Sequence, residues 1–550
     1  MEELKAIAND KNAIYERFYR ELKFGTGGLR GILGVGTNRM NIYIVAKATQ
    51  GYSNYLKRIY KKPSIAIAYD SRKKSDVFAR TAACVFAANG ILVNFYTELM
   101  PTPALSFAVR YLKCDGGIVI TASHNPAKYN GYKVYGADGC QITTKVAKDI
   151  YLEIEKVDIF SGIKSIAWAM AVKKGQIVEI EKDVIDSYID AVSVQSLCKK
   201  DAIDRGVSIV YTPLNGTGLK CVMRCLNENS FTNISVVKEQ REPDGEFATC
   251  PYPNPEMREA LELGLRDAES LGSDLLLATD PDCDRVGIAV KSGEGYTLLN
   301  GNEVGLLLLV YICEKRKESG CMPEKPIMIK SIVSTDLATR IAEDYGVETI
   351  NVLTGFKFIG EQIGFLEKKG EADRFILGFE ESYGYLTGEY VRDKDGVNAS
   401  LMICEMCAYY KTRGLSLIEV LNQIYHKYGY CLNTQHCYDF EGSEGSAKMQ
   451  RIMENVRNNM PMTFAGKRVV KIYDYQLSVE YDYEMNLKKA IMLPKSNVLK
   501  FMLEDYCSVT MRPSGTEPKM KVYFSVCATD KEDAEQSELC LSQEVEKRFM

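Results

Sequence analysis

Short apolar runs rich in β-branched residues alternate along this chain with longer segments of helical periodicity. A strand-like run, a helical segment and a second strand-like run follow one another three times, over residues 63–96, 206–237 and 326–352. Buried strands that alternate with helices are typical of parallel sheets whose faces are covered by helices. The pattern therefore predicts three similar α/β units.

Each unit is followed by one more apolar strand, and this strand runs directly into a polar loop. The three loops are TASHNP at residues 121–126, TDPDCDR at 279–285 and FEESYG at 379–384. In open α/β sheets, ligands bind beyond the carboxyl ends of the strands. We therefore expect the three loops to contribute to one composite site between the units.

The C-terminal segment has a different pattern and predicts a fourth, smaller domain. Its strand at residues 506–511 ends in another polar loop, RPSGTEPKMK. The predicted fold class is α/β, with three similar units of mixed or parallel sheets and a C-terminal α+β domain. The predicted domains are residues 1–203, 204–312, 313–435 and 436–550.

Composition and charge narrow the possible partners. Of the 550 residues, 46% are hydrophobic and 26% are charged, as in ordinary globular proteins. The net charge is −4 and no basic stripe stands out, so nucleic acid is not an expected partner. The longest strongly apolar stretch, residues 305–313, is far shorter than the roughly 20 residues of a membrane span. The polar N-terminal residues lack the apolar core of a signal peptide, so we expect a cytoplasmic protein without a membrane partner.

Cysteine and histidine usage limits the possible metal and redox sites. Seventeen cysteines lie scattered in apolar segments, which favours reduced buried thiols over a disulfide framework in a chain of this length. Cys404 and Cys407 form a C-x-x-C within a helical pattern, and we interpret them as a packed helix face rather than a zinc or redox site. With only three histidines in the chain, a multi-histidine metal site is not expected.

The first loop, in TASHNPAKYNGYK, carries a candidate nucleophile. Ser123 follows the strand, His124 is next to it, and Lys133 lies ten residues further on. A serine that attacks carbon usually lies in a Gly-x-Ser-x-Gly elbow, which is absent here. A serine that exchanges phosphoryl groups needs positive charge nearby, which His124 and Lys133 supply. The alternative is a turn serine that caps a helix.

The second loop predicts a metal site. Asp280, Asp282 and Asp284 alternate, so that three carboxylates can converge on one hard cation. A calcium EF-hand would need glycine and glutamate where this chain has Arg285 and Lys291. Mg²⁺ fits better, because it favours a few carboxylates together with phosphate oxygens. The alternative is a solvated acidic turn.

The third loop and a segment after it predict contacts to a phosphorylated sugar. Strand alternation would place Glu380 and Ser382 on one side, as acceptors for sugar hydroxyls, with Glu381 on the other. In VRDKDG, Arg392 and Lys394 are candidates to attract a phosphate. The alternative is an ordinary surface turn, since charged glutamate pairs are common there.

Two glycine-containing turns complete the set of candidate loops. In RPSGTEPK, Arg512, Ser514 and Thr516 offer phosphate ligands, and Gly515 lets backbone N–H groups approach closely. In FGTGGLRG, Arg30 lies in a glycine-rich turn and is a candidate partner for phosphate. An ordinary surface turn is the alternative in both cases.

Together and in this order, six motifs resemble those of the α-D-phosphohexomutase family, which includes phosphoglucomutases and phosphomannomutases. They are FGTGGLRG, TASHNPAKYNGYK, TDPDCDR, TGFKFIG, FEESYG and RPSGTEPK, and they span residues 24–519. The segments GTNRMN and VRDKDG are most similar to the phosphoglucomutase branch.

The resemblance implies four domains around a central cleft and a role for each motif. Ser123 would be the phosphorylated residue, and it would hold Mg²⁺ together with Asp280, Asp282 and Asp284. His124, Lys133 and Arg30 would act at the reacting centre, with Arg285 supporting the metal loop. The sugar and its non-reacting phosphate would contact Thr354, Gly355, Lys357, Glu380, Ser382, Arg512, Ser514, Gly515 and Thr516.

The function implied is interconversion of glucose 1-phosphate and glucose 6-phosphate. It would proceed through a phosphoserine and a hexose 1,6-bisphosphate, which is also the expected activator. Alternatives within the family are a phosphomannomutase, a phosphopentomutase or a sugar bisphosphate synthase. Outside it they are a phosphatase with Asp280 or Asp282 as nucleophile and a non-catalytic sugar-phosphate sensor.

Overall fold

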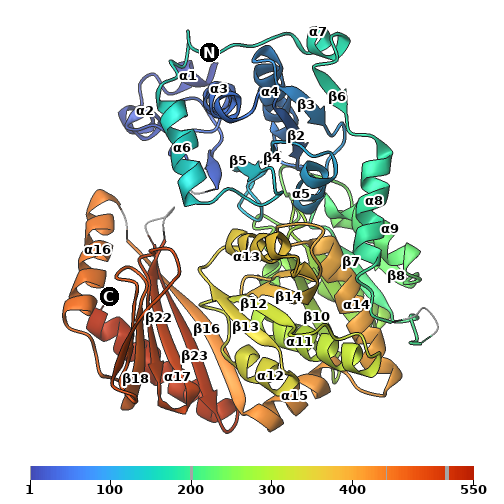
Figure 1. Cartoon of the computed structure of the whole chain (residues 1–550), viewed down its shortest axis with the longest axis vertical. Coiled ribbons are helices and arrows are strands. Elements are labelled where there is room, and N and C mark those ends of the chain that lie inside the picture. The colour runs from blue at the N-terminus through green and yellow to red at the C-terminus, as the bar shows by residue number, and fades with distance from the viewer. Residues whose placement is uncertain (1, 26, 199–201, 441, 515–518, 550) are drawn as a thin grey trace.

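The computed structural model contains three α/β units and a separate antiparallel sheet (Figure 1). It describes residues 2–25, 27–198, 202–440, 442–514 and 519–549. The α/β units fill the upper and right-hand parts of Figure 1, and the antiparallel sheet lies at the lower left. The predicted fold class is confirmed.

The three α/β units share one strand order. The first strand of each unit lies between two parallel neighbours, and the last strand pairs antiparallel with the outer edge of one of these neighbours as its hairpin partner. In the first unit this order is β5-β4-β2-β3, in the second β10-β9-β7-β8, and in the third β15-β14-β12-β13. The strands are β2 (Ser64–Tyr69), β3 (Leu92–Phe95), β4 (Gly116–Ile120), β5 (Tyr129–Gly136), β7 (Ile209–Thr212), β8 (Ile234–Val236), β9 (Leu275–Thr279), β10 (Val286–Ser292), β12 (Ile327–Ser331), β13 (Glu348–Val352), β14 (Phe375–Glu380) and β15 (Gly384–Leu386).

The predicted crossover helices are α4 (Ser75–Ala88), α9 (Gly218–Glu228) and α12 (Leu337–Tyr345). The strands β4, β9 and β14 are buried along their whole lengths. Their near-continuous apolar runs follow from this burial on both faces. Each ends at one of the polar loops, so the carboxyl ends of these strands determine where the loops lie.

Further strands extend the sheets of the first two α/β units at their edges. The first sheet gains β1 (Gly28–Ile32) beside β5 and β6 (Ile177–Glu179) beside β3, and the second gains β11 (Gly295–Leu299) beside β10. Other helices of these units are α3 (Ile42–Ile59), α5 (Thr102–Tyr111), α11 (Gly301–Glu318), α13 (Phe356–Lys369) and α14 (Gly396–Thr412).

The C-terminal unit is an antiparallel sheet with its own apolar core. Its order is β16-β23-β22-β21-β18-β19-β20, and every neighbouring pair is antiparallel. The strands are β16 (Tyr430–Asp439), β18 (Lys467–Asp474), β19 (Val479–Asp482), β20 (Leu487–Ala490), β21 (Leu499–Leu503), β22 (Ser508–Pro513) and β23 (Lys519–Ala528). Helices α16 (Gly442–Asn458) and α17 (Lys531–Phe549) belong to the same unit.

The predicted domain limits stay predictions. The limits at residues 312 and 435 fall inside α11 and β16, so a division at either residue would cut a continuous element. All seventeen cysteines are free thiols and most of them are buried, as expected. No helix of the described residues is long and apolar enough to cross a bilayer.

Candidate functional site

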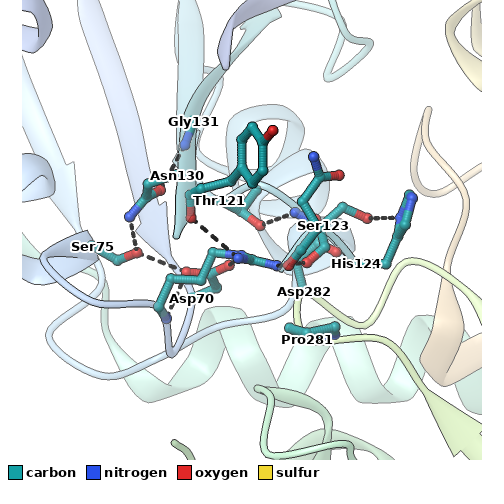
Figure 2. Close-up of polar contacts among 12 residues, drawn as sticks. Asp70, Ser75, Thr121, Ser123, His124, Asn130, Gly131, Pro281 and Asp282 are labelled. Carbon is teal, nitrogen blue, oxygen red and sulfur yellow. Dashed lines mark hydrogen bonds and ion pairs between the residues drawn. The ribbon is translucent and has the colours of Figure 1, made fainter. Parts of the chain in front are cut away.

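Ser123 lies in the turn after β4 and its hydroxyl points at the aspartate loop of the second unit. Its Oγ donates a hydrogen bond to Asp280 Oδ2 at 2.7 Å. The same oxygen lies 3.1 Å from His124 Nδ1 (Figure 2). The residue is only 3% exposed and adopts a left-handed backbone with φ 51°. The two loops that the sequence separates by more than 150 residues therefore meet at one hydrogen bond.

The three aspartates follow β9 and form a buried group of carboxylates. Their candidate ligand oxygens all lie within 4.8 Å of one another. The backbone N–H groups of Asp284 and Arg285 both donate to Asp280 Oδ1, at 3.0 Å, and so fix the turn. The geometry is that of a site for one cation bound by oxygen ligands.

Positive groups surround the carboxylates without satisfying all of their oxygens. Lys133 Nζ donates to Asp282 at 2.7 Å and to Asp284 at 2.9 Å, and Lys394 Nζ lies 2.9 Å from Asp284. The hydroxyl of Thr102, at the start of α5, donates to Asp282 at 2.9 Å. Asp282 Oδ1 and Asp284 Oδ1 are buried and have no hydrogen-bond partner. Two unpartnered buried carboxylate oxygens fit a divalent cation, since buried charges are normally paired or coordinate metals.

The pKa values reflect this crowding of charge. Burial raises the pKa of the Asp280 carboxyl, and repulsion from Asp282 and Asp284 raises it further. Burial acts in the same direction on Asp284, but Lys133, Lys394 and Arg285 outweigh it and hold the pKa well below its ordinary value. For Lys133, burial acts to lower the pKa, yet the two carboxylates outweigh it and raise the pKa. Lys133 is thus an ammonium ion in this arrangement and would have to lose a proton before acting as a base.

The third loop is arranged differently from the predicted strand alternation. Glu380 is the last residue of β14, and its Oε1 accepts a hydrogen bond from Gly355 N at 2.6 Å. Residues 381–383 form a turn, so alternation ends at Glu380. Glu381 and Ser382 both line a cavity of about 280 Å³ between the third and fourth units, whereas Glu380 does not. The expected strand alternation therefore stops before Ser382, and the assignment of Ser382 as a sugar ligand stays a prediction.

Glu381 has a supporting role that the sequence did not suggest. Its Oε2 accepts hydrogen bonds from Ser331 Oγ at 2.9 Å and from Ser334 Oγ at 3.2 Å. Ser331 is the last residue of β12, and Ser334 lies in the loop that follows. The third loop is thus held against its own sheet. Burial raises the pKa of Glu380 to about 7, and Glu381 adds to the increase.

The remaining candidates of the first and second units lie close to the serine turn and the aspartate loop. Arg30, on β1, donates to Asn125 Oδ1 in the serine turn at 3.1 Å. Arg285 pairs with Glu256 at 2.5 Å and approaches Asp284 at 3.9 Å. Burial lowers the pKa of His124 well below its ordinary value, with Arg285 and Arg30 adding to the effect. The histidine beside Ser123 is therefore a neutral imidazole.

Candidates of the third unit differ in their surroundings. Thr354 Oγ1 is buried without a hydrogen-bond partner, and burial lowers the pKa of Lys357 to about 8. Arg392 is fully buried, pairs with Glu367 at 2.9 Å and donates to the carbonyl of Val391 at 3.0 Å. In this conformation its side chain has no surface to offer a substrate, and its assignment as a phosphate ligand stays a prediction.

The fourth loop is described only in part. Arg512 lies at the end of β22, with Nη1 3.4 Å from the hydroxyl of Tyr523, and Ser514 N donates to Lys519 O at 2.7 Å. Gly515 and Thr516 lie outside the described residues. The predicted phosphate cradle therefore stays a prediction.

Sequence reasoning missed two residues beside the serine turn and the aspartate loop. Thr102 contacts Asp282 through both its hydroxyl and its backbone N–H, which donates to the Asp282 carbonyl at 2.9 Å. Arg72 contacts the turn that carries Ser123. The position of Arg72, just beyond the carboxyl end of a predicted parallel strand, was a usable signal. Thr102 had none, because its contact depends on how the first two units pack.

Comparison with known proteins agrees with the arrangement of loops and sheets. Family models described as phosphoglucomutase/phosphomannomutase alpha/beta/alpha domains I, II and III match residues 21–159, 186–293 and 300–428. A phosphoglucomutase of Staphylococcus haemolyticus (strain JCSC1435) is 36% identical over 512 residues, which cover 92% of this chain and 91% of that protein. A phosphoglucomutase of Staphylococcus aureus (strain MRSA252) is 37% identical over 530 residues, covering 95% and 92%.

A solved structure shows the same fold at lower sequence identity. A phosphoglucomutase/phosphomannomutase family protein from Burkholderia thailandensis superposes with a TM-score of 0.69 at 17% identity. The match covers 95% of this chain and 97% of that one. The shared fold thus includes the C-terminal unit, which the three family models leave unmatched.

Proposed function

The chain belongs to the phosphoglucomutase/phosphomannomutase family, and from this membership we propose that it interconverts glucose 1-phosphate and glucose 6-phosphate. The supporting relatives named phosphoglucomutase are 36–37% identical over at least nine-tenths of the chain. The observation that carries the proposal is the 2.7 Å hydrogen bond from Ser123 Oγ to Asp280 within the group of three carboxylates. A hydroxyl so placed can accept a phosphoryl group next to a bound cation.

We propose a reaction in two transfers. Phosphorylated Ser123 donates to the free hydroxyl of a hexose monophosphate: the bond from phosphorus to Oγ breaks as the bond to the sugar oxygen forms. The proton of that hydroxyl passes to a base. Lys133 is the candidate, once its ammonium group has given up the proton that it holds beside Asp282 and Asp284 in this arrangement. The hexose 1,6-bisphosphate then turns over in the site, and its other phosphoryl group returns to Ser123. Mg²⁺, held by the phosphoserine and the three aspartates, would offset charge on the transferring group.

The same family resemblance supports the remaining proposed contacts. His124 and Arg30 would stabilise charge around Ser123, and Arg285 would support the aspartate loop. Residues proposed to bind the sugar and its second phosphate are Thr354, Gly355, Lys357, Glu380, Ser382, Lys394, Arg512, Ser514, Gly515 and Thr516. The substrate is thus a small sugar phosphate.

A coupled assay against three substrates tests this function. With Mg²⁺ and glucose 1,6-bisphosphate present, we expect kcat/KM for glucose 1-phosphate to exceed those for mannose and ribose 1-phosphates by about tenfold or more. Omitting the bisphosphate should reduce the rate. Faster turnover of mannose or ribose phosphate would identify a different mutase. Steady release of inorganic phosphate would identify a phosphatase, net bisphosphate production a synthase, and binding without turnover a sensor.

The pKa of Glu380 predicts a pH dependence. Because burial raises this pKa to about 7, the carboxylate that would accept sugar hydroxyls is lost as the pH falls through neutrality. We expect kcat/KM to fall about tenfold per pH unit well below pH 7, and Glu380→Gln to lose this acid limb. At each pH, the substrate concentration should be that of the dianionic form, because phosphate monoesters take up a proton near pH 6. An unchanged acid limb in Glu380→Gln would contradict the assignment.

A further inference from the structure

We propose that Arg72 is the positioning residue of the phosphoserine turn, holding the backbone of Ser123 so that its hydroxyl faces the aspartates. The inference rests on the proposed function, because it concerns the serine that would carry the phosphoryl group. Among its described contacts, Arg72 touches neither the hydroxyl of Ser123 nor the three aspartates of the second loop. It would act on the reaction only through the shape of the turn.

The turn needs such support because its backbone is strained. Ser123 has φ 51°, in the left-handed region that residues other than glycine adopt at a cost of roughly 1 kcal/mol or more. Its N–H donates to Thr121 Oγ1 at 2.8 Å, which restrains one side of the turn. The carbonyl groups on the other side require donors, since buried carbonyl oxygens are normally hydrogen-bonded.

The guanidinium of Arg72 supplies those donors from its two terminal nitrogens. Nη2 donates to the carbonyls of Ser123 and Asn125. Nη1 donates to the carbonyls of Pro126 at 3.0 Å and Tyr129 at 3.2 Å. Nε lies 3.3 Å from Asp70 Oδ2. Four hydrogen bonds therefore reach four carbonyls in residues 123–129, and the contact of Nε with Asp70 is an ion pair. A lysine has three donors on one nitrogen and cannot span this set.

Asp70 extends the contact from the turn to the neighbouring strand. The Asp70 and Arg72 side chains are both fully buried. Asp70 Oδ1 accepts from Ser75 Oγ at 2.7 Å, and Ser75 Oγ in turn accepts from Asn130 Nδ2 at 3.0 Å (Figure 2). Asn130 Oδ1 accepts from Gly131 N at 2.7 Å. This chain of bonds ends on β5, the strand that also carries Lys133, so the turn and the lysine share one scaffold.

The second unit presses on the same loop. The guanidinium of Arg72 lies 5.0 Å from the ring centroid of Phe247. Gly245 approaches so closely that a Cβ there would lie 2.7 Å from Lys73 N and 2.8 Å from Ser71 O. The arginine is thus fixed between the turn of the first unit and a loop of the unit that carries the aspartates. Its position couples the direction of the serine to the packing of the two units.

A purely structural role for a buried arginine is the competing explanation, and the chain offers a matched control. Arg205 is 7% exposed, donates to the carbonyls of Asn229 and Cys198 at 2.8 and 2.9 Å, and pairs with buried Glu405 at 3.2 Å. Its guanidinium lies 4.9 Å from the ring centroid of Phe231. It resembles Arg72 in burial, pairing and ring contact, but none of its described contacts is with the serine turn or the aspartate loop.

The test compares Arg72→Lys with Arg205→Lys in full-length protein. Three quantities are measured: denaturant stability, the single-turnover rate of Ser123 phosphorylation by glucose 1,6-bisphosphate, and KM for glucose 1-phosphate. We expect both variants to lose stability. Only Arg72→Lys should slow phosphorylation, by about 10²-fold, with KM little changed, because a small misplacement of a reacting group costs rate rather than binding. Ser75→Ala, which leaves the arginine in place, should slow it less and serves if Arg72→Lys fails to fold.

Two results would overturn the inference. Phosphorylation at the wild-type rate in Arg72→Lys and Ser75→Ala would show that the turn keeps its shape without this network. An equal slowing in Arg205→Lys would show that the effect is general loss of stability. If the wild-type protein itself takes no phosphoryl group from the bisphosphate, the proposed function has failed. If only the inference about Arg72 has failed, wild-type phosphorylation stays intact and the variants match it or slow equally.

Discussion

Replacement of Ser123 by alanine is expected to reduce kcat for glucose 1-phosphate by about 10⁴-fold or more, even with Mg²⁺ and glucose 1,6-bisphosphate present. Losses of this size follow removal of a covalent nucleophile whose partners act as a unit. The Ser123 hydroxyl lies 2.7 Å from Asp280 and 3.1 Å from His124, and the alanine variant lacks this group. Protein phosphorylation by labelled bisphosphate should disappear with the activity.

The control for this variant is another buried serine. Ser53 is fully buried in α3 and donates to the Thr49 carbonyl at 2.7 Å. Ser53→Ala should retain both turnover and labelling. Near-normal turnover in Ser123→Ala would reject the serine assignment, and labelling that persists there would point to a different phosphorylated residue.

The second large effect is expected for Asp282→Asn. Asp282 has one oxygen bonded to Lys133 and Thr102 and one without a partner, which fits a metal ligand. We expect Mg²⁺-dependent activity to fall by about 10²-fold or more, since the asparagine keeps the shape but not the charge. Because Lys133 keeps Asp284 as a partner, stability without Mg²⁺ should change far less than activity.

Thermal unfolding gives a readout of the metal that does not depend on activity. A ligand that binds only the folded state at a hundred times its Kd stabilises it by about 2.7 kcal/mol. We expect Mg²⁺ to raise the Tm of the wild type but not of Asp282→Asn. Asp474→Asn, at a buried aspartate paired with Arg457 in the C-terminal unit, should keep the rise. Equal wild-type activity with and without a chelator would remove the metal proposal.

Local pattern was enough to predict the three repeated units and the place of their loops. Continuous apolar runs such as those of β4, β9 and β14 occur in strands buried on both faces, and such strands belong to sheets covered by helices. Polar residues directly after them must lie at the carboxyl ends of the strands. Ser123 and the three aspartates could thus be chosen as candidates from the sequence.

Strand alternation was a poor guide wherever the strand had ended. Ser382 was expected beside Glu380, but it follows a strand that stops at Glu380, and the turn places it on a cavity wall with Glu381. Period-two alternation holds only while the backbone stays extended. Arg392 was selected for its charge, yet it is buried against Glu367. Charge alone does not say whether a side chain faces solvent, a ligand or a partner.

By itself, the sequence determined the order of strands and helices and the chemistry that each loop offers, because both depend on residues close together in the chain. Only the tertiary structure decided that the Ser123 hydroxyl contacts Asp280 and that Arg72 binds the backbone carbonyls of the serine turn. It also decided that burial raises the pKa of Glu380 to about 7. These properties come from contacts between residues tens to hundreds of positions apart and from the exclusion of water around them, and no local pattern encodes either.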